Sequence, residues 1–332
     1  MKNFICLFIT LCFSLQSFSQ MKYSLNSGEN NALWYVKDYH KDDLSTKFFN
    51  ETEWIPATVP GTIFVDAVNA GLEKEPNFGD NIYQVDKDKY NKDHIYRLEF
   101  NVPENKDLAQ KRIWLNFDGI NRSGEIYLNN NLLGSLKGMM MRGRFDVTKL
   151  INKKGTNLLS VIVSLPNQRR HPEEKFANLA SPTYLSSAGW DWMPYVPGLN
   201  TGITDNVYLT FTQDVTLQDP WIRTKLHNRA EFAEVEISTE IENCSSRKVV
   251  VELSGVITPG NIKFRKELLL EADTAQTIIL DGRVIKELRI KEPRLWWPNG
   301  MGETNLYECK LAIAVNGRIS DEKQITFGIR EY

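Results

Sequence analysis

Apolar and polar residues alternate in short runs along most of the chain. Between Tyr96 and Val102 the apolar side chains share one face, and Arg97, Glu99 and Asn101 share the other. This period-2 pattern predicts a half-buried strand. Similar short runs follow at 113–117, 126–128, 145–151, 158–163 and 207–211. Many short strands with little helical pattern between them are typical of two packed sheets, so we predict a β-sandwich for this part of the chain.

One short helix interrupts this β-rich region. Thr62 follows a Val-Pro-Gly run and is a good N-cap residue for a helix over 63–70, which Gly71 would end. The segment 75–93 is rich in Asn, Asp, Gly and Pro, and we predict a loop there. Asn129, Asn130 and Asn131 tolerate left-handed backbone geometry and predict a tight turn.

A second β-rich unit follows a predicted short junction at 212–220. Apolar and polar residues alternate over 235–241, and further runs lie at 249–253, 264–270 and 277–280. Asn316-Gly317 is a strong hairpin turn between the runs 307–315 and 319–329. About seven strands in roughly a hundred residues are typical of an immunoglobulin-like sandwich. We therefore predict an all-β chain with one domain over 21–214 and a second over 215–332.

The segment 166–206 lacks a strand pattern for roughly forty residues, and unpatterned stretches of this length inside a compact domain are usually functional. It contains Gly189-Trp190-Asp191-Trp192-Met193-Pro194. Two indole rings beside a carboxylate offer flat apolar faces for a sugar ring and acceptors for its hydroxyl groups. Trp190, Asp191 and Trp192 are therefore our candidate substrate-binding residues. The alternative is an aromatic plug between sheets, with Asp191 capping a turn.

Composition and charge exclude several classes of function. Residues 1–20 have a basic start, an apolar centre and a small polar end, as in a cleaved signal peptide, which predicts a secreted or periplasmic protein. No later stretch is long and apolar enough to predict a membrane span. A net charge of −2 without a basic stripe argues against nucleic acid as a partner. The four histidines have no ligand spacing, so we predict no metal site and no cofactor. Cys244 and Cys309 remain after the signal, either paired or as buried thiols.

Five separated pieces, taken together and in this order, resemble the non-catalytic front half of glycoside hydrolase family two, closest to its β-mannosidase and exo-β-glucosaminidase branches. The pieces are Trp54 with Val59-Pro60-Gly61-Thr62; Phe117-Asp118-Gly119-Ile120-Asn121 with Tyr127-Leu128-Asn129; Gly189-Trp190-Asp191-Trp192; Leu295-Trp296-Trp297-Pro298-Asn299-Gly300; and Phe327-Gly328-Ile329-Arg330. The resemblance covers essentially all of the chain after the signal.

The resemblance implies a jelly-roll, galactose-binding-like sugar-binding domain, then an immunoglobulin-like domain, then a (β/α)8 barrel C-terminal to Tyr332 that carries both catalytic glutamates. It also implies that the Trp190 to Trp192 loop reaches the barrel and helps to close the pocket around a terminal β-linked mannose or glucosamine-type sugar. Met193 departs from the usual β-mannosidase pattern, which has Gly there. In the family the acid follows an Asn on a barrel strand, and the one Asn-Glu pair here, Asn50-Glu51, is better explained as a solvated turn. We assign no catalytic residue.

The expected function is therefore the N-terminal part of a secreted retaining exo-β-glycosidase of β-mannosidase type, acting in carbohydrate catabolism. Retaining hydrolysis needs two carboxyl groups about 5 to 5.5 Å apart. Because the resemblance places both of them in the barrel, we expect the 332-residue chain to be inactive by itself. The alternatives are a stand-alone carbohydrate-binding protein, the accessory half of an exo-β-glucosaminidase, and a purely structural β-adaptor. We interpret Trp296 and Trp297 as a structural plug against Pro298 rather than as a sugar platform.

Overall fold

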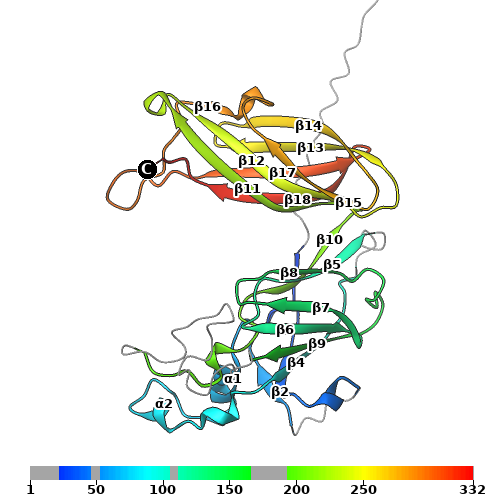
Figure 1. The fold of residues 1–332 in the computed structure, drawn as a ribbon, viewed down its shortest axis with the longest axis vertical. Coiled ribbons are helices and arrows are strands. Elements are labelled where there is room, and N and C mark those ends of the chain that lie inside the picture. The colour runs from blue at the N-terminus through cyan, green and yellow to red at the C-terminus, as the bar shows by residue number, and fades with distance from the viewer. Residues whose placement is uncertain (1–21, 46–52, 105–110, 166–192, 332) are drawn as a thin grey trace, which may run out of the picture.

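The computed structural model describes residues 22–45, 53–104, 111–165 and 193–331, and these form two β-sandwiches, one above the other in Figure 1. Strands β1 to β10 build the first sandwich and strands β11 to β18 build the second. All strand pairs in both are antiparallel. The predicted fold class, a jelly-roll-type sandwich followed by an immunoglobulin-like sandwich, is confirmed.

The first sandwich packs a four-stranded sheet against a six-stranded one. In spatial order the four-stranded sheet consists of β1 (Lys22–Ser24), β10 (Val207–Thr212), β5 (Arg112–Phe117) and β8 (Gly143–Asp146). The six-stranded sheet consists of β3 (Ile55–Ala57), β2 (Trp34–Asp38), β4 (His94–Phe100), β9 (Asn157–Ser164), β6 (Ser123–Leu128) and β7 (Asn131–Lys137). The run predicted over 145–151 is a strand only as far as Asp146, because the chain turns there.

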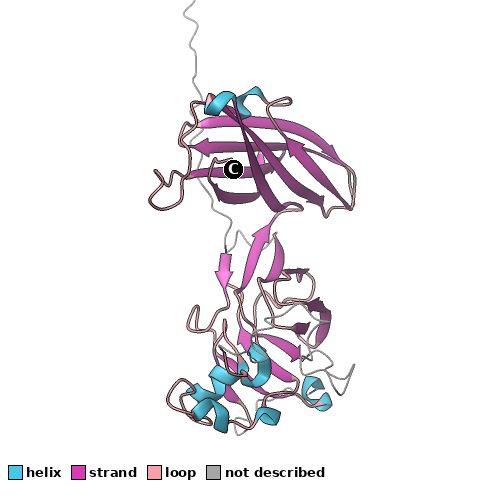
Figure 2. Cartoon of the chain, turned by 60° about the vertical axis from the view of Figure 1, so that its left-hand side comes forward, coloured by secondary structure: helices cyan, strands magenta, loops and turns pink. Residues whose placement is uncertain are grey.

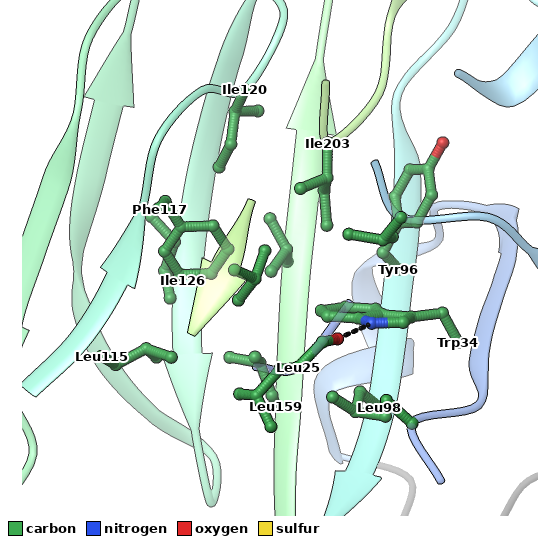
Figure 3. Packing of buried hydrophobic residues seen from close by; sticks show 14 of the residues in the cluster. Leu25, Trp34, Tyr96, Leu98, Leu115, Phe117, Ile120, Ile126, Leu159 and Ile203 are labelled. Carbon is green, nitrogen blue, oxygen red and sulfur yellow. Dashed lines mark hydrogen bonds between the residues drawn. The ribbon is translucent and has the colours of Figure 1, made fainter. Parts of the chain in front are cut away.

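The core between these sheets comes from the apolar face of each alternating run. Figure 3 shows Trp34 of β2 lying among Leu98, Leu159 and Ile203, with its indole Nε1 donating a hydrogen bond of 2.7 Å to the carbonyl oxygen of Leu25. Trp34 is 2% exposed. A buried indole N–H needs such an acceptor, because an unpaired buried donor costs about 1 to 3 kcal/mol. Leu25 directly follows β1, so this bond ties the end of β1 to the six-stranded sheet.

The other face of the six-stranded sheet is also covered, which the alternation did not predict. Arg97 of β4 was expected to face solvent, yet it is 1% exposed, and its neighbour Ile95 is fully buried. The Arg97 guanidinium lies 5.0 Å from the centre of the Trp54 ring and donates a hydrogen bond to the carbonyl oxygen of Asp43. Asp43 belongs to a 3-10 helix, Lys41–Ser45, that crosses this face. A sequence pattern records one face as polar, but it does not show what packs on it.

Two α-helices lie at the end of the first sandwich that is farthest from the second domain, as Figure 2 shows. Helix α1 (Ile63–Asn69) occupies the predicted position and buries Ile63, Phe64, Asp66 and Ala67. Thr62 precedes it in extended backbone geometry, but its side chain makes no capping hydrogen bond. Helix α2 (Asn81–Gln84) and a 3-10 helix, Lys87–Lys89, lie within the segment predicted as a loop.

The second sandwich consists of two four-stranded sheets. One contains β11 (Val215–His227), β12 (Phe232–Asn243) and β15 (Thr274–Leu280), with β16 (Arg289–Lys291) also paired to β12. The other contains β14 (Ile262–Leu270), β13 (Val249–Thr258), β17 (Tyr307–Val315) and β18 (Arg318–Phe327). Asn316 and Gly317 both have positive φ, 50° and 74°, so the hairpin predicted between β17 and β18 is confirmed.

The segment 212–220, predicted as a short junction between the domains, is mostly strand. Strand β10 ends at Thr212 and β11 begins at Val215, so most of that segment is strand. Pro220 lies where the β11–β12 register shifts between Gln218 and Trp221, because proline has no N–H to donate to the ladder.

Two arginines of the first domain hold the second. Arg112 bonds Asp146 of its own domain at 2.7 Å and Asp214 at 2.9 Å, and it donates to the carbonyl oxygen of Cys244. Arg144 stacks over Trp114, 3.6 Å from the ring centre, and lies 3.6 Å from the carboxylate of Glu242. Because both guanidinium groups contact residues from each side, they restrain the angle between the domains.

The remaining predictions about chain segments concern the N-terminus, the thiols and the membrane. The predicted signal, residues 1–20, lies outside the described residues. Cys244 and Cys309 are free thiols, and Cys309 is fully buried on β17. Among the described residues no helix combines the length and apolar character that crossing a bilayer requires.

Candidate functional site

The predicted sugar-binding residues Trp190, Asp191 and Trp192 lie outside the described residues. The description resumes at Met193, and residues 193–206, here called the returning segment, show where this excursion rejoins the first domain. Its anchors define the candidate site that we describe from its residues upward.

The returning segment makes a tight bend that only certain residues can form. A 3-10 stretch, Pro197–Asn200, contains Gly198, Leu199 and Asn200, all with positive φ of 69°, 52° and 58°. A Cβ on Gly198 would lie 3.1 Å from the Ile63 side chain of α1. Left-handed backbone geometry is sterically unfavourable for leucine. Leu199 is held in it because its side chain is packed in the interior, where it is 1% exposed. The bend is therefore fixed by packing against α1.

The side chain of Asn121 binds the backbone carbonyl groups of this bend. Its side-chain nitrogen donates to the carbonyl oxygens of Leu199, at 3.1 Å, and Asn200, at 2.7 Å. Its backbone N–H and carbonyl exchange two hydrogen bonds with Gly202, at 2.9 and 2.8 Å. Asn121 is fully buried, so these bonds satisfy groups that water does not reach.

The chain at residues 61–63 also binds the returning segment at this place. Gly61 donates to the carbonyl oxygen of Ile203 at 2.8 Å, and Ile63 donates to that of Thr201 at 2.9 Å. A Cβ on Gly202 would lie 2.4 Å from the Gly61 carbonyl oxygen, so only glycine fits there. Two of the sequence pieces that carried the family resemblance, the Val-Pro-Gly-Thr run and the run ending at Asn121, thus meet the returning segment here.

Polar side chains cluster beside this meeting point, and we name Asn91, Asn121, Arg122 and Tyr195 the Asn121 patch. The Tyr195 hydroxyl and the Asn91 amide exchange hydrogen bonds of 2.7 and 2.9 Å. The ammonium group of Lys87 lies 4.4 Å from the centre of the Tyr195 ring. Arg122 is fully buried.

Burial sets the protonation states in this patch. Burial lowers the pKa of Arg122 to about 10, against an opposing effect of Tyr195. Burial also raises the pKa of Tyr195, while its bond to Asn91 and the charge of Arg122 act in the opposite direction. At neutral pH the arginine is therefore charged and the phenol neutral, so neither is suited to proton transfer. Asn121 and Arg122 are fully buried, so their part in the patch is to hold the base of the excursion, while Asn91 and Tyr195 are its partly exposed members.

Sequence reasoning found only part of this site. Asn121 lay within a recognised motif but had no assigned role, and Arg122, Tyr195 and Asn91 were missed. Asn91 is 104 residues from Tyr195 in the chain, so no spacing rule connects them. The positional signal for Asn121 was its place in the short link between β5 and β6, where a polar residue interrupts two apolar strands.

Trp296 and Trp297 are not brought to the Asn121 patch. Both are half-buried in the second domain, and the Arg330 guanidinium lies 5.6 Å from the centre of each ring. The Trp296 N–H donates to the carbonyl oxygen of Ile329 at 3.0 Å. A Cβ on Gly328 would lie 2.9 Å from the Trp296 Cβ, so the chain packs closely here. These contacts are those of a structural anchor for the last strand.

Two family models match the chain in succession. One described as "Glycosyl hydrolase 2 galactose-binding domain-like" matches residues 34–205, and one described as "Glycosyl hydrolases family 2" matches residues 215–330. The Asn121 patch lies within the first match, and the Trp296–Arg330 contacts lie within the second.

Similar proteins carry related names. The chain is 30% identical over 300 residues to a mannosylglycoprotein endo-beta-mannosidase of Lilium longiflorum, a match that covers 84% of this chain and 30% of that protein. It is 25% identical over 293 residues to an exo-beta-D-glucosaminidase of Streptomyces avermitilis, covering 87% of this chain and 30% of that protein. The chain therefore spans about a third of the length of these relatives.

Solved structures agree on the fold. A beta-D-mannosidase from Dictyoglomus thermophilum superposes with a TM-score of 0.73 and 26% identity, over 94% of this chain and 36% of that one. An exo-chitosanase of Amycolatopsis orientalis, in complex with PNP-beta-D-glucosamine, superposes with a TM-score of 0.76 and 20% identity, over 94% of this chain and 34% of that one. The second likeness is one of fold alone.

Proposed function

Because this chain belongs to glycosyl hydrolase family 2, we propose that it is the N-terminal part of a secreted, retaining, exo-acting β-glycosidase of β-mannosidase type. The observation that carries this proposal is the succession of two family models over residues 34–205 and 215–330. The endo-beta-mannosidase at 30% identity and the beta-D-mannosidase at 26% identity favour a mannoside over a glucosaminide as the substrate, and the exo action is part of our proposal.

Within this proposal the first domain supplies one wall of a sugar pocket. The Asn121 patch holds the base of the excursion that contains Trp190, Asp191 and Trp192. The network from Gly61, Asn121 and Gly202 leaves the base of this loop little freedom, and a binding loop with a rigid base loses less entropy when it meets its ligand. The indole rings would stack on the sugar and Asp191 would accept hydrogen bonds from its hydroxyl groups.

The catalytic groups belong, in this proposal, to a barrel that follows Tyr332. Retaining hydrolysis needs a protonated carboxyl and a nucleophilic carboxylate about 5 to 5.5 Å apart. No residue of this chain is assigned either role. The substrate-binding groups proposed here would therefore act on a sugar whose glycosidic bond is cleaved by the barrel.

The test is an activity assay on the 332-residue protein and on a longer protein that includes the downstream coding sequence. We expect no turnover of aryl β-mannoside or aryl β-glucosaminide by the former and turnover of the mannoside by the latter. Substantial turnover by the pure 332-residue protein would overturn the division of roles. Cleavage of internal linkages without release of terminal sugar would contradict exo action, and an inverted anomer in the first product would contradict retention.

The secreted location is tested separately. We expect the protein recovered from medium or periplasm to begin near residue 21, as read by N-terminal sequencing. An intact Met1 on protein that remains in the cytosol would contradict this part of the proposal.

A further inference from the structure

A second recess lies in the first domain, between helix α1 and strands β2, β3 and β4. Its volume is about 370 Å³. This falls within the range of about 300 to 1,000 Å³ that is typical of ligand pockets. It lies beside the helix that also supports the returning segment, but none of the residues of the Asn121 patch lines it.

One side of the recess is apolar. Ile63 and Ala67 come from one face of α1, since they are four residues apart, and Ile55 comes from β3. Leu72 closes the mouth and is 60% exposed. An exposed leucine next to buried apolar groups offers C–H contacts to an entering ligand at little structural cost.

Other lining residues are charged, and each of them has an ion-pair partner. Lys37 bonds Glu53 at 2.9 Å and Asp43 at 2.8 Å. Lys92 bonds Asp38 at 2.8 Å. A ligand with a net charge would have to compete with these pairs, and the cost is largest at Lys37 and Asp43, whose side chains are 10% and 9% exposed.

The same pattern continues on the far wall. Lys89 lies 3.2 Å from the carboxylate of Glu73, and the Tyr90 hydroxyl donates to that carboxylate at 2.8 Å. His94 lines the inner end of the recess, is 1% exposed, and has its Nε2 3.5 Å from the Asp38 carboxylate. Burial lowers the pKa of His94 to about 4, so the ring is neutral at pH 7.

Ion pairing still leaves hydrogen-bonding capacity in this wall. A carboxylate has about four lone-pair positions, and an ammonium group has three donors. Asp38 and Glu53 both line the recess and are 47% and 60% exposed at their side chains, so part of each carboxylate remains open to solvent. The charged residues that line the recess, Lys37, Lys89, Asp38 and Glu53, carry no net charge, and beside the apolar lining they match a compact molecule with several hydroxyl groups and a C–H surface.

We propose that this recess is a binding site for a neutral hexose-sized polyhydroxylated molecule, held by Asp38, Glu53 and His94 against Ile55 and Leu72. The proposal does not rest on the function proposed above, because it concerns binding by this domain and requires no hydrolysis. Nothing in it depends on Trp190, Asp191 or Trp192.

Calorimetric titration of the 332-residue protein with D-mannose as the probe tests the proposal. We expect a dissociation constant on the order of 1 mM, as for a small ligand in an open recess. D-glucosamine and D-glucuronate, which carry a positive and a negative charge, should bind at least about tenfold more weakly. Absence of binding by the neutral sugar, or tighter binding by either charged sugar, would overturn the proposal.

Two substitutions locate the binding. Leu72→Trp narrows the mouth and should weaken binding at least about tenfold. Leu132→Trp, at a leucine of β7 that is similarly exposed at 58%, is the matched control and should bind as the unsubstituted protein does. Equal affinity in the two variants would overturn the assignment of the recess.

A third variant and a mapping experiment guard against misfolding of the first variant. Asp38→Asn keeps the side-chain shape and removes one charge, and it should also weaken binding. Hydrogen exchange should show sugar-dependent protection in peptides that cover 34–40 and 87–96. Protection confined to the returning segment would place the sugar at the candidate site described above and would contradict this proposal.

Discussion

Strands β4 and β12 show how differently the two domains use a similar alternating sequence. Along β12 burial alternates almost strictly, so one face lies in the core and the other meets solvent. Along β4 all positions but Glu99 are buried, because Trp54 and the 3-10 helix at Lys41–Ser45 cover the second face. The additional layer brings ionisable groups into the interior of the first domain.

This difference matches our proposals, in which the first domain binds ligands and the second supports it. In the described part of the first domain Asp66, His94, Arg97 and Arg122 are each at most 1% exposed. The second domain has regular strands of up to 13 residues, and its charged groups lie mostly at the surface. Both the Asn121 patch and the recess beside α1 belong to the first domain. Four pairs of substitutions, from the largest expected effect to the smallest, test this contrast.

Two glycines in tight contacts should differ because their neighbours differ. A Cβ at Gly202 would lie 2.4 Å from the Gly61 carbonyl oxygen and 2.8 Å from the Thr62 Cα, both backbone atoms. A Cβ at Gly255 would lie 2.2 Å from the Phe264 ring, which can rotate. We expect Gly202→Ala to lower the free energy of unfolding by about 3 kcal/mol and Gly255→Ala by about 1 kcal/mol. Urea denaturation measures both, and an equal loss would contradict the rigid anchor in the first domain.

Two buried ionisable groups should give opposite pH dependences. Burial raises the pKa of Asp66 to about 7 from 3.8, so the folded state binds more protons than the unfolded state and stability falls as pH rises through this range. Burial lowers the pKa of His94 to about 4 from 6.5, so the unfolded state binds more protons and stability rises over that range. The two effects largely cancel below pH 6.5.

A variant that lacks one of these groups should show the pH dependence of stability that the other group causes. Between about pH 4.5 and 6.5 we expect Asp66→Asn to gain roughly 2 kcal/mol of stability with rising pH and His94→Gln to lose a similar amount. Asp66→Asn can keep the 2.7 Å bond from the Thr58 N–H, so its fold should persist. Thermal unfolding across pH measures the slopes, and two flat profiles would contradict the burial of these groups.

A pair of buried asparagines should have equal structural roles and different functional ones. Asn121 donates to the carbonyl oxygens of Leu199 and Asn200, and Asn243 donates to those of Arg247 and Glu271, at 2.9 and 2.8 Å. Each change to Ala leaves two carbonyl groups without this donor and should cost about 2 kcal/mol. In a barrel-containing enzyme only Asn121→Ala should also raise KM, and a KM rise of equal size in Asn243→Ala would contradict the assigned site.

The smallest effects are expected at exposed ion pairs. Arg112 bridges the domains with its side chain 24% exposed, whereas Arg223 pairs with Glu236 on the second domain with its side chain 52% exposed. We expect Arg112→Ala to cost about 1 kcal/mol and Arg223→Ala less than about 0.5 kcal/mol. Calorimetry should show a larger difference between the unfolding temperatures of the two domains in Arg112→Ala, and no such change in Arg223→Ala. Unchanged coupling in that variant would show that the angle between the domains does not depend on this contact.

The sequence predicted elements whose cause is local. Helix α1, the Asn129–Asn130 turn and the β17–β18 hairpin each depend on a few neighbouring residues, since Gly317 and the asparagines accept positive φ that most residues avoid. Alternation located most strands, because a strand with one buried face shows its period directly. The order of the five family-like pieces also predicted the family correctly.

The tertiary structure alone decided what covers each face and which distant residues meet. Arg97 reads as solvent-facing in the sequence, yet it is buried, because Trp54 and residues 41–45 happen to fold over it. Asn91 and Tyr195, or Arg112 and Asp214, are about a hundred residues apart and become neighbours only when the sheets pack. Local pattern encodes the preference of a residue for water or for the interior, whereas its partner is chosen by the packing of whole sheets, which no short stretch of sequence contains.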